Sequence, residues 1–237
     1  MPRCDRIKSS LIVVGLAVLL LVISGAHAPA EKLHHRSDNS ANGLVDQATH
    51  ELDRLVFGQR KTVTSGLGPV YNATSCVECH QSPISGGSSR VTVLRAGHRD
   101  FQSGKFVEAH GGSLVHTQAV DPGFQEHLPA TENVRSLRLS INLLGDGFVE
   151  AIDDSTLISI AREQPGSSGG RIAGEVVWVP VLEAPGRKRA GRFGWKDQHG
   201  SLLSAVADSL RNEIGITNRL YPTESSPQAQ SKSDLED

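Results

Sequence analysis

Cys76-Val77-Glu78-Cys79-His80 is the stretch around which the rest of the chain is organised. Two cysteines three positions apart, with a histidine directly after them, form the attachment site of a c-type haem. Each thiol adds to one vinyl group of the porphyrin as a thioether, and one helical turn brings both sulfurs to the same porphyrin edge. The imidazole of His80 is then the proximal iron ligand. The motif predicts one covalently attached haem c.

Two other uses of the cysteine pair are open. A structural zinc ion takes about four nitrogen or sulfur ligands, commonly from two such pairs. The remaining cysteine, Cys4, lies within the first 30 residues. A redox dithiol normally lies where a strand meets a helix in a βαβ unit, and no such alternation surrounds Cys76. Haem attachment is therefore favoured over both.

Composition indicates a loop-rich protein of one large domain or two small ones. The chain has 237 residues, of which 38% are hydrophobic and 4% aromatic, with Gly 24 and Pro 11. A haem would supply a large apolar plate for side chains to pack on. The formal net charge is −2, so the overall balance does not suggest a nucleic-acid partner.

The first 30 residues have the pattern of an export signal. Basic residues are followed by an apolar run over residues 11–23 and then by small residues up to Ala30. If the segment is not cleaved, residues 11–28 are long enough to act as a membrane anchor. We therefore expect an exported or periplasmic protein. Export and the haem motif agree, because bacteria attach haem c outside the cytoplasm.

The predicted fold is mainly α, a cytochrome c-like haem domain with long loops and a few short β-strands. We expect a linker over residues 31–45, a mono-haem domain over 46–224, and a disordered polar tail over 225–237. Apolar periodicity and capping residues predict helices at 46–57, 134–144, 155–163 and 201–213. Alternation or valine enrichment predicts strands at 90–95, 113–120 and 175–182.

Five further stretches resemble the di-haem oxidoreductase/peroxidase family, which is related to the bacterial di-haem cytochrome c peroxidases. They occur in the same order as in that family, over about residues 55–222: Gly66-Leu67-Gly68-Pro69 leading to Asn72-Ala73-Thr74-Ser75, Gly111-Gly112-Ser113-Leu114-Val115-His116, Leu144-Gly145-Asp146-Gly147-Phe148-Val149-Glu150-Ala151-Ile152, Gly191-Arg192-Phe193-Gly194-Trp195-Lys196-Asp197-Gln198-His199, and Gly215-Ile216-Thr217. The resemblance implies a haem-bearing redox protein of peroxidase type.

The chain departs from the family pattern in two ways. The family carries a second haem motif in a C-terminal cytochrome domain, whereas this sequence contains a single C-x-x-C-H. Many relatives also have an acidic, glycine-rich loop ahead of the Gly-Arg-Phe-Gly-Trp motif. Residues 164–170 stand at that place without a carboxylate. Calcium needs six or more oxygen ligands, usually several from carboxylates, so no calcium site is predicted.

The second axial position of the iron decides the function. Electron-carrier cytochromes c commonly use a methionine there, and Met1 is the one methionine of this sequence. The choices left are a second histidine or an open position where peroxide binds. His116 and His199 are the candidates for a distal ligand, although a lone histidine is more often a structural hydrogen-bonding residue.

The resemblance to peroxidases also implies other site residues. Glu150 lies among apolar neighbours and is the candidate acid–base group for breaking the O–O bond; the alternative is a solvent-facing or capping carboxylate. Trp195, or Trp178, resembles the tryptophan that assists electron transfer between the two haems, with simple aromatic packing as the alternative. Arg192 and Lys196 are candidates for pairing with haem propionates.

The sequence thus favours an exported c-type haem redox protein that reduces peroxide or a related oxidant. Electrons would come from a partner cytochrome or from a protein that carries the missing second haem. Two alternatives stay open. One is a non-enzymatic electron-transfer or haem-binding module with two histidine ligands on the iron, and the other is a truncated, inactive remnant.

Overall fold

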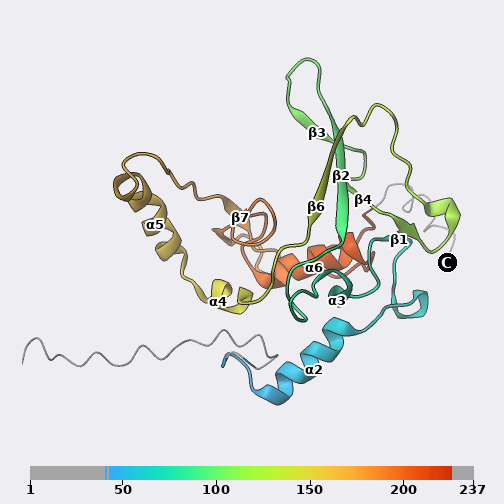
Figure 1. Cartoon of the computed structure of the whole chain (residues 1–237), viewed down its shortest axis with the longest axis horizontal. Helices are drawn as coiled ribbons and strands as arrows, with labels where there is room; N and C mark the ends of the chain where they lie inside the picture. Colours follow the sequence, from blue (N-terminus) through green and yellow to red (C-terminus); the bar gives the residue numbers. More distant parts are fainter. Residues whose placement is uncertain (1–40, 42, 226–237) are drawn as a thin grey trace, which may run out of the picture. The chain divides into compact units, whose positions relative to one another are not determined.

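Strand β2, Thr92–Arg99, is the longest strand and the centre of the largest sheet (Figure 1). The computed structural model describes residues 41 and 43–225, which belong to one compact unit, Ser37–Asp237. One edge of β2 pairs antiparallel with two short strands, and the other edge pairs with β6 in a six-residue register from Thr92↔Leu139 to Gly97↔Val134. The three partners of β2 are β3 (Phe106–Glu108), β4 (Leu114–Val115) and β6 (Val134–Leu139).

The prediction of a mainly α, cytochrome c-like fold is wrong. Within residues 41 and 43–225, five α-helices accompany eight strands in three sheets. The decisive error is the helix expected at 134–144. Its first part reads Val-Arg-Ser-Leu-Arg-Leu, which alternates with the period of a strand, and Val134–Leu139 forms β6. The long antiparallel pairing of β6 with β2 satisfies the backbone of both segments and creates the sheet.

Two small sheets complete the strand structure. Strand β1, Val70–Tyr71, pairs with β5, Gln118–Ala119. Strand β7, Trp178–Pro180, pairs with β8, Lys188–Ala190. The strand predicted at 175–182 is therefore present but much shorter, because only its middle residues find a partner across the turn.

The helices at 46–57 and 201–213 are confirmed, and each begins one residue later than predicted, after a residue whose side chain caps the helix. Helix α2, Gln47–Gly58, begins after Asp46, whose carboxylate accepts from the Thr49 amide. Helix α6, Leu202–Glu213, begins after Ser201, whose hydroxyl accepts from the Ser204 amide. Such side-chain caps satisfy amide groups that have no partner within the helix. The other helices are α3 (Cys76–Cys79), α4 (Asp146–Ala151) and α5 (Asp154–Ser167).

Helix α6 lies across the end of the large sheet (Figure 1). An ion pair between Arg95 of β2 and Glu213 at the end of α6, with an N–O distance of 3.7 Å, joins the two. The core consists mostly of small and branched apolar side chains, and the most buried residues include Val70, Val93, Ala96, Ala190, Phe193 and Ile214. The core is small, in keeping with the low aromatic content.

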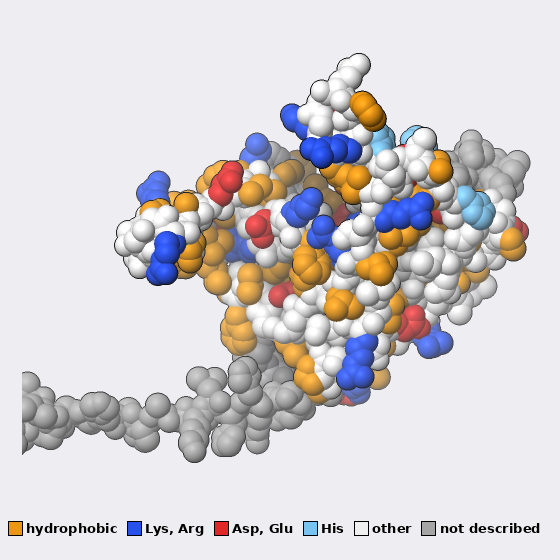
Figure 2. Space-filling view, turned by 45° about the horizontal axis from the view of Figure 1, so that its top comes forward, with side chains coloured by type: hydrophobic (Ala, Val, Ile, Leu, Met, Phe, Trp, Pro, Cys, Tyr) orange, Lys and Arg blue, Asp and Glu red, His pale blue; other side chains and the backbone are white. Residues whose placement is uncertain are grey.

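Many large apolar side chains stay exposed. On α2, Leu52, Leu55 and Val56 are 64%, 57% and 63% exposed. Figure 2 shows hydrophobic side chains interspersed with Lys, Arg, Asp and Glu on the face that it presents. None of the helices described is long and apolar enough to cross a membrane. The expected export segment 1–30, the anchor at 11–28, most of the linker and the tail from residue 226 lie outside the described residues.

Candidate haem-attachment site

The cysteine pair lies on a single helical turn. Helix α3 covers Cys76–Cys79, and the amide of His80 donates to the carbonyl of Cys76 over 3.0 Å. Cys79 is buried and Cys76 is half-buried, and both are free thiols. Two sulfurs one turn apart lie on the same side of a helix. The local structure thus meets the requirement for two thioether bonds to one porphyrin edge.

The ring of His80 is bonded through Nδ1 to the loop that follows α3. Nδ1 lies 3.2 Å from the carbonyl oxygen of Gly87. A carbonyl can only accept, so Nδ1 carries the hydrogen, and Nε2 is the nitrogen suited to a metal. Burial lowers the pKa of His80, against the opposing effect of the Gly87 and Ile141 carbonyls. Burial therefore favours the neutral imidazole, which is the form that binds iron.

Gly87 is required for this contact. An added Cβ at Gly87 would lie 2.1 Å from the carbonyl oxygen of Ser82, so the backbone of the loop after α3 could not close. The Ser82 amide donates to Ser88, and the Ser88 amide donates back to Ser82. The Gly86 amide donates to the carbonyl of His80 over 2.9 Å. The glycine-containing loop after α3 therefore fixes the orientation of His80.

The thiols lie in a partly apolar environment. Burial raises the pKa of Cys76 and of Cys79, and for Cys79 the charges of Glu213 and Glu78 raise it further. Hydroxyl groups of Ser140 and Ser89 act in the opposite direction on Cys79. Both sulfurs are therefore held as neutral thiols, which disfavours the low-pKa thiolate of a reactive redox cysteine.

Glu78 ties the turn to its surroundings. Its carboxylate accepts from the backbone amide and the hydroxyl of Thr74, each over 2.8 Å. Arg60 adds an ion pair at 3.2 Å from the segment after α2. The aromatic ring of Phe57 at the end of α2 lies 6.4 Å from the His80 ring, centroid to centroid. Helix α2 thus covers one side of the attachment turn.

The segment that leads into α3 docks on the C-terminal end of α6. The amides of Asn72 and Ala73 donate to the carbonyl of Glu213, and the amide of Gly68 donates to the carbonyl of Ile214. These bonds satisfy carbonyl groups that a helix end leaves without partners. A Cβ at Gly68 would lie 2.0 Å from the carbonyl oxygen of Gly215. Two of the stretches used for the family resemblance are therefore in direct contact.

The residues around the turn fit a covalently held haem. The hydroxyl of Ser75, directly before Cys76, is buried to 2% exposure and has no hydrogen-bond partner. A buried hydroxyl without a partner is costly and is consistent with a missing polar group nearby. No cluster of three His, Cys, Asp or Glu side chains suited to a metal occurs among the described residues. A haem needs none, because the porphyrin supplies most of the iron ligands. Cys76, Cys79 and His80 would hold it.

His116 has partners at both ring nitrogens. Nε2 lies 2.7 Å from the carbonyl oxygen of Asn212, and Nδ1 lies 3.0 Å from a carboxylate oxygen of Glu126. The side chain is 3% exposed. In this arrangement neither nitrogen is available to iron, and the ring instead donates to the C-terminal end of α6. The geometry favours the structural alternative for His116, and its role as distal ligand stays a prediction.

His199 and Trp195 lie in the loop that follows β8. Nε2 of His199 is 3.5 Å from the carboxylate of Asp208 on α6. Trp195 is 51% exposed, and the guanidinium of Arg138 lies 5.4 Å above its ring. This is a cation–π pair at the surface. The structure does not bring these residues into hydrogen-bond or ring contact with His80.

Glu150 lies in α4, and its carboxylate connects α4 to β8 and to α6. One carboxylate oxygen accepts from Arg189 of β8 over 2.8 Å, and the other accepts from the Leu202 amide at the start of α6 over 3.0 Å. Its side chain is 34% exposed. Both contacts are with hydrogen-bond donors, as expected for a structural carboxylate at a helix N-terminus. The acid–base role of Glu150 stays a prediction.

The side chain of Arg192 is buried. Its side chain is 3% exposed, and its guanidinium binds the Asp154 carboxylate and the carbonyl of Ile152. A further bond reaches the carbonyl of Val149 over 3.3 Å. These contacts hold the ends of α4 and α5 against β8. All of its polar partners are protein groups, so the geometry gives no support to the predicted pairing with a propionate. Lys196, in contrast, is exposed.

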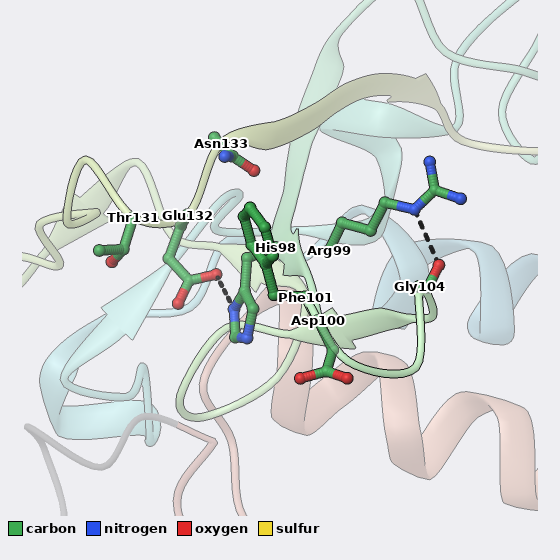
Figure 3. A pocket seen from close by; sticks show the side chains of 8 residues that line it. All are labelled: His98, Arg99, Asp100, Phe101, Gly104, Thr131, Glu132 and Asn133. Carbon is green, nitrogen blue, oxygen red and sulfur yellow. Dashed lines mark hydrogen bonds and ion pairs between the residues drawn. The ribbon is translucent and has the colours of Figure 1, made fainter.

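Two features of the structure have no counterpart in the local sequence patterns. Glu213 and Asn72 form a side-chain bond of 3.2 Å between positions 141 residues apart, and no local pattern reveals such a pairing. The other feature is a pocket of about 690 Å³ between the β2–β3 hairpin and the residues before β6 (Figure 3). Its residues are His98, Arg99, Asp100, Phe101, Gly104, Thr131, Glu132 and Asn133. The attachment turn does not contribute to it.

Comparison with known proteins supports one family. Residues 120–232 match the model of a family described as "Di-haem oxidoreductase, putative peroxidase". The match covers just under half of the 237 residues and begins after the C-x-x-C-H motif. Neither the search of curated proteins nor the search of solved structures gave a match. The resemblance inferred from the sequence motifs is thus confirmed over residues 120–232, which are similar to the di-haem oxidoreductase family.

Proposed function

We propose that the chain is an exported c-type haem redox protein of peroxidase type, with one haem attached at Cys76 and Cys79. The observation that carries the proposal is the geometry of the motif. Both thiols lie on one turn, and the ring of His80 is fixed through Nδ1 so that Nε2 is the metal-binding nitrogen. The similarity of residues 120–232 to a di-haem oxidoreductase family supports the same chemistry.

The chain itself would position and shield the haem. Gly87 orients the imidazole, and Phe57 packs near it. When bound, the haem supplies an iron centre that can exchange electrons and bind peroxide. Reduction of hydrogen peroxide to two waters consumes two electrons and two protons. A partner cytochrome, or a protein with the second haem, would deliver the electrons.

An accessible second axial position is favoured over a second histidine. His116 is engaged at both ring nitrogens, and Nε2 of His199 faces a carboxylate. Histidine ligation would require either ring to give up these partners. This observation supports peroxide reduction over the alternative of an electron carrier with two histidine ligands.

The optical spectrum of the matured full-length protein tests the proposal. An open or water-bound ferric haem gives high-spin bands that shift when cyanide or peroxide is added, and the same spectrum is expected for the His116→Gln and His199→Gln variants. Low-spin bands that do not respond to cyanide, and that change to high spin in one of these variants, would establish the carrier instead. Peroxide consumption with a reduced cytochrome as donor then measures the activity.

A further inference from the structure

Glu213 has an unusual position beside the attachment turn. It is the last residue of α6, and its backbone carbonyl accepts from the amides of Asn72 and Ala73, a few residues before Cys76. Its side chain is 30% exposed and turns toward the same segment, where one oxygen accepts from Nδ2 of Asn72 over 3.2 Å. The carboxylate is therefore partly buried and held close to the haem-bearing segment.

The contacts of Glu213 do not lock it in the ionised form. The Arg95 guanidinium is 3.7 Å away through a single nitrogen, which is a loose ion pair rather than a two-point clamp. The amide of Asn72 can bond to a carboxylate or to the carbonyl oxygen of a carboxylic acid. The charged and titratable groups that face Glu213 are Arg95 from β2, His116 from the β4–β5 connection, Asp208 from α6 and Cys79 from α3.

Glu213 and the attachment turn are coupled electrostatically. The negative charge of Glu213 is, after burial, the largest influence that raises the pKa of the Cys79 thiol. Burial also raises the pKa of Glu213, and Arg95 and Asn72 offset part of that effect. The carboxylate is also bonded to Asn72, four residues before Cys76. A change of charge at a haem attached to this turn would therefore act on Glu213 through a partly buried region, where the dielectric screening is weak.

We propose that Glu213 takes up a proton from solvent when the haem is reduced and releases it when the haem is oxidised. This inference rests on the proposed attachment of haem at Cys76 and Cys79. In the haem-loaded chain, one electron from the partner cytochrome would lower the charge of the iron by one, and one proton from solvent would add to a carboxylate oxygen of Glu213. The lower charge would favour the neutral acid at Glu213 in the reduced protein and the carboxylate in the oxidised protein.

The haem midpoint potential of the full-length matured protein, measured from about pH 4 to pH 8, tests the proposal. Glu213 should have a higher pKa in the reduced protein than in the oxidised protein. Between these two pKa values the haem midpoint potential should fall as the pH rises. Full coupling shifts the ferrous/ferric equilibrium tenfold per pH unit, which is about 59 mV for one electron. Glu213→Gln should flatten the curve in that interval, whereas Glu213→Asp should keep a slope. Glu163→Gln, on the exposed part of α5, is the matched control and should behave as the wild type.

An infrared difference spectrum gives a second readout on the unmodified protein, in case Glu213→Gln does not fold. Reduction should produce a carboxylic-acid C=O band, and Glu213→Asp should move that band. A wild-type spectrum without the band, or a potential whose pH slope is the same in Glu213→Gln, overturns the inference while haem attachment stands. A chain that takes up no haem overturns the inference together with the proposed function.

Discussion

Replacement of Arg192 by alanine should destabilise the protein by about 3 kcal/mol. The guanidinium is 3% exposed, pairs with Asp154, and donates to the carbonyl groups of Ile152 and Val149. Its Nε donates to the carbonyl of Ala190 over 3.1 Å. Removal of one partner from a buried charged pair costs about 3–5 kcal/mol, because the other partner is left desolvated.

The lower end of that range applies here for two reasons. The side chain of Asp154 is 24% exposed, so water can solvate part of the freed carboxylate. Arg189 also stays 3.7 Å from the same carboxylate. A loss of 3 kcal/mol is still a large share of a typical free energy of unfolding, about 5–15 kcal/mol. Arg192→Lys should recover little, since an ammonium cannot span the same forked set of acceptors.

Urea unfolding of the wild type and of Arg192→Ala gives the difference directly, provided that the two slopes agree. Arg187→Ala is the control. Arg187 is exposed in the basic loop before β8, and its loss should change the free energy of unfolding by less than about 0.5 kcal/mol. A decrease of less than about 1 kcal/mol in the free energy of unfolding of Arg192→Ala would contradict the structural role given to the contacts of Arg192. A shift in the haem spectrum without a loss of stability would instead support the propionate contact predicted from the sequence.

Three further outcomes are expected. Gly68→Ala should destabilise by more than about 2 kcal/mol, because the new Cβ would overlap the Gly215 backbone that caps α6, as urea unfolding can show. The phenol of Tyr221 should titrate with a pKa of about 12 by ultraviolet absorbance, since burial and then the charge of a nearby aspartate disfavour the phenolate. Glu150→Gln should cost about 1 kcal/mol through the weakened ion pair with Arg189, while peroxide turnover per haem stays near the wild-type value.

Matched measurements decide these outcomes. Gly58→Ala adds a Cβ that meets nothing within 4 Å at the end of α2, so it should be neutral or stabilising. Tyr71→Phe leaves Tyr221 as the single tyrosine, and a midpoint near pH 10 would refute the buried environment given for it. Complete loss of turnover in Glu150→Gln at full haem loading would establish the acid–base role that the sequence predicts.

Local signals predicted the parts of the fold that local interactions determine. The helices at 46–57 and 201–213 have a capping side chain and one apolar stripe, and both form. The C-x-x-C-H motif likewise forms a single turn without help from distant residues. Where the structure of a segment depends on a partner far along the chain, the local sequence does not decide between helix and strand. Residues 134–139 become a strand because β2 lies beside them.

The same distinction applies to the site. His80 and the cysteines follow from a motif, whereas Glu213 reaches the attachment segment from 141 residues beyond Asn72. The contacts of Glu150 and Arg192 could not be predicted from the sequence either. Glu150 binds residues of β8 and α6, and Arg192 binds Asp154 of α5. A charged residue among apolar neighbours in the sequence is a candidate for a specific role. Whether that role is catalytic or structural depends on the residues that it contacts in the fold.

Intact-mass spectrometry of the full-length protein, matured in cells that attach haem c, tests the central claim most directly. The wild type should gain the mass of one haem that survives denaturation, and the doubly substituted Cys76→Ala, Cys79→Ala chain should not. His80→Ala should keep the thioether-bound mass but change the absorption spectrum of the haem. A wild-type chain of unmodified mass and without colour would contradict the account.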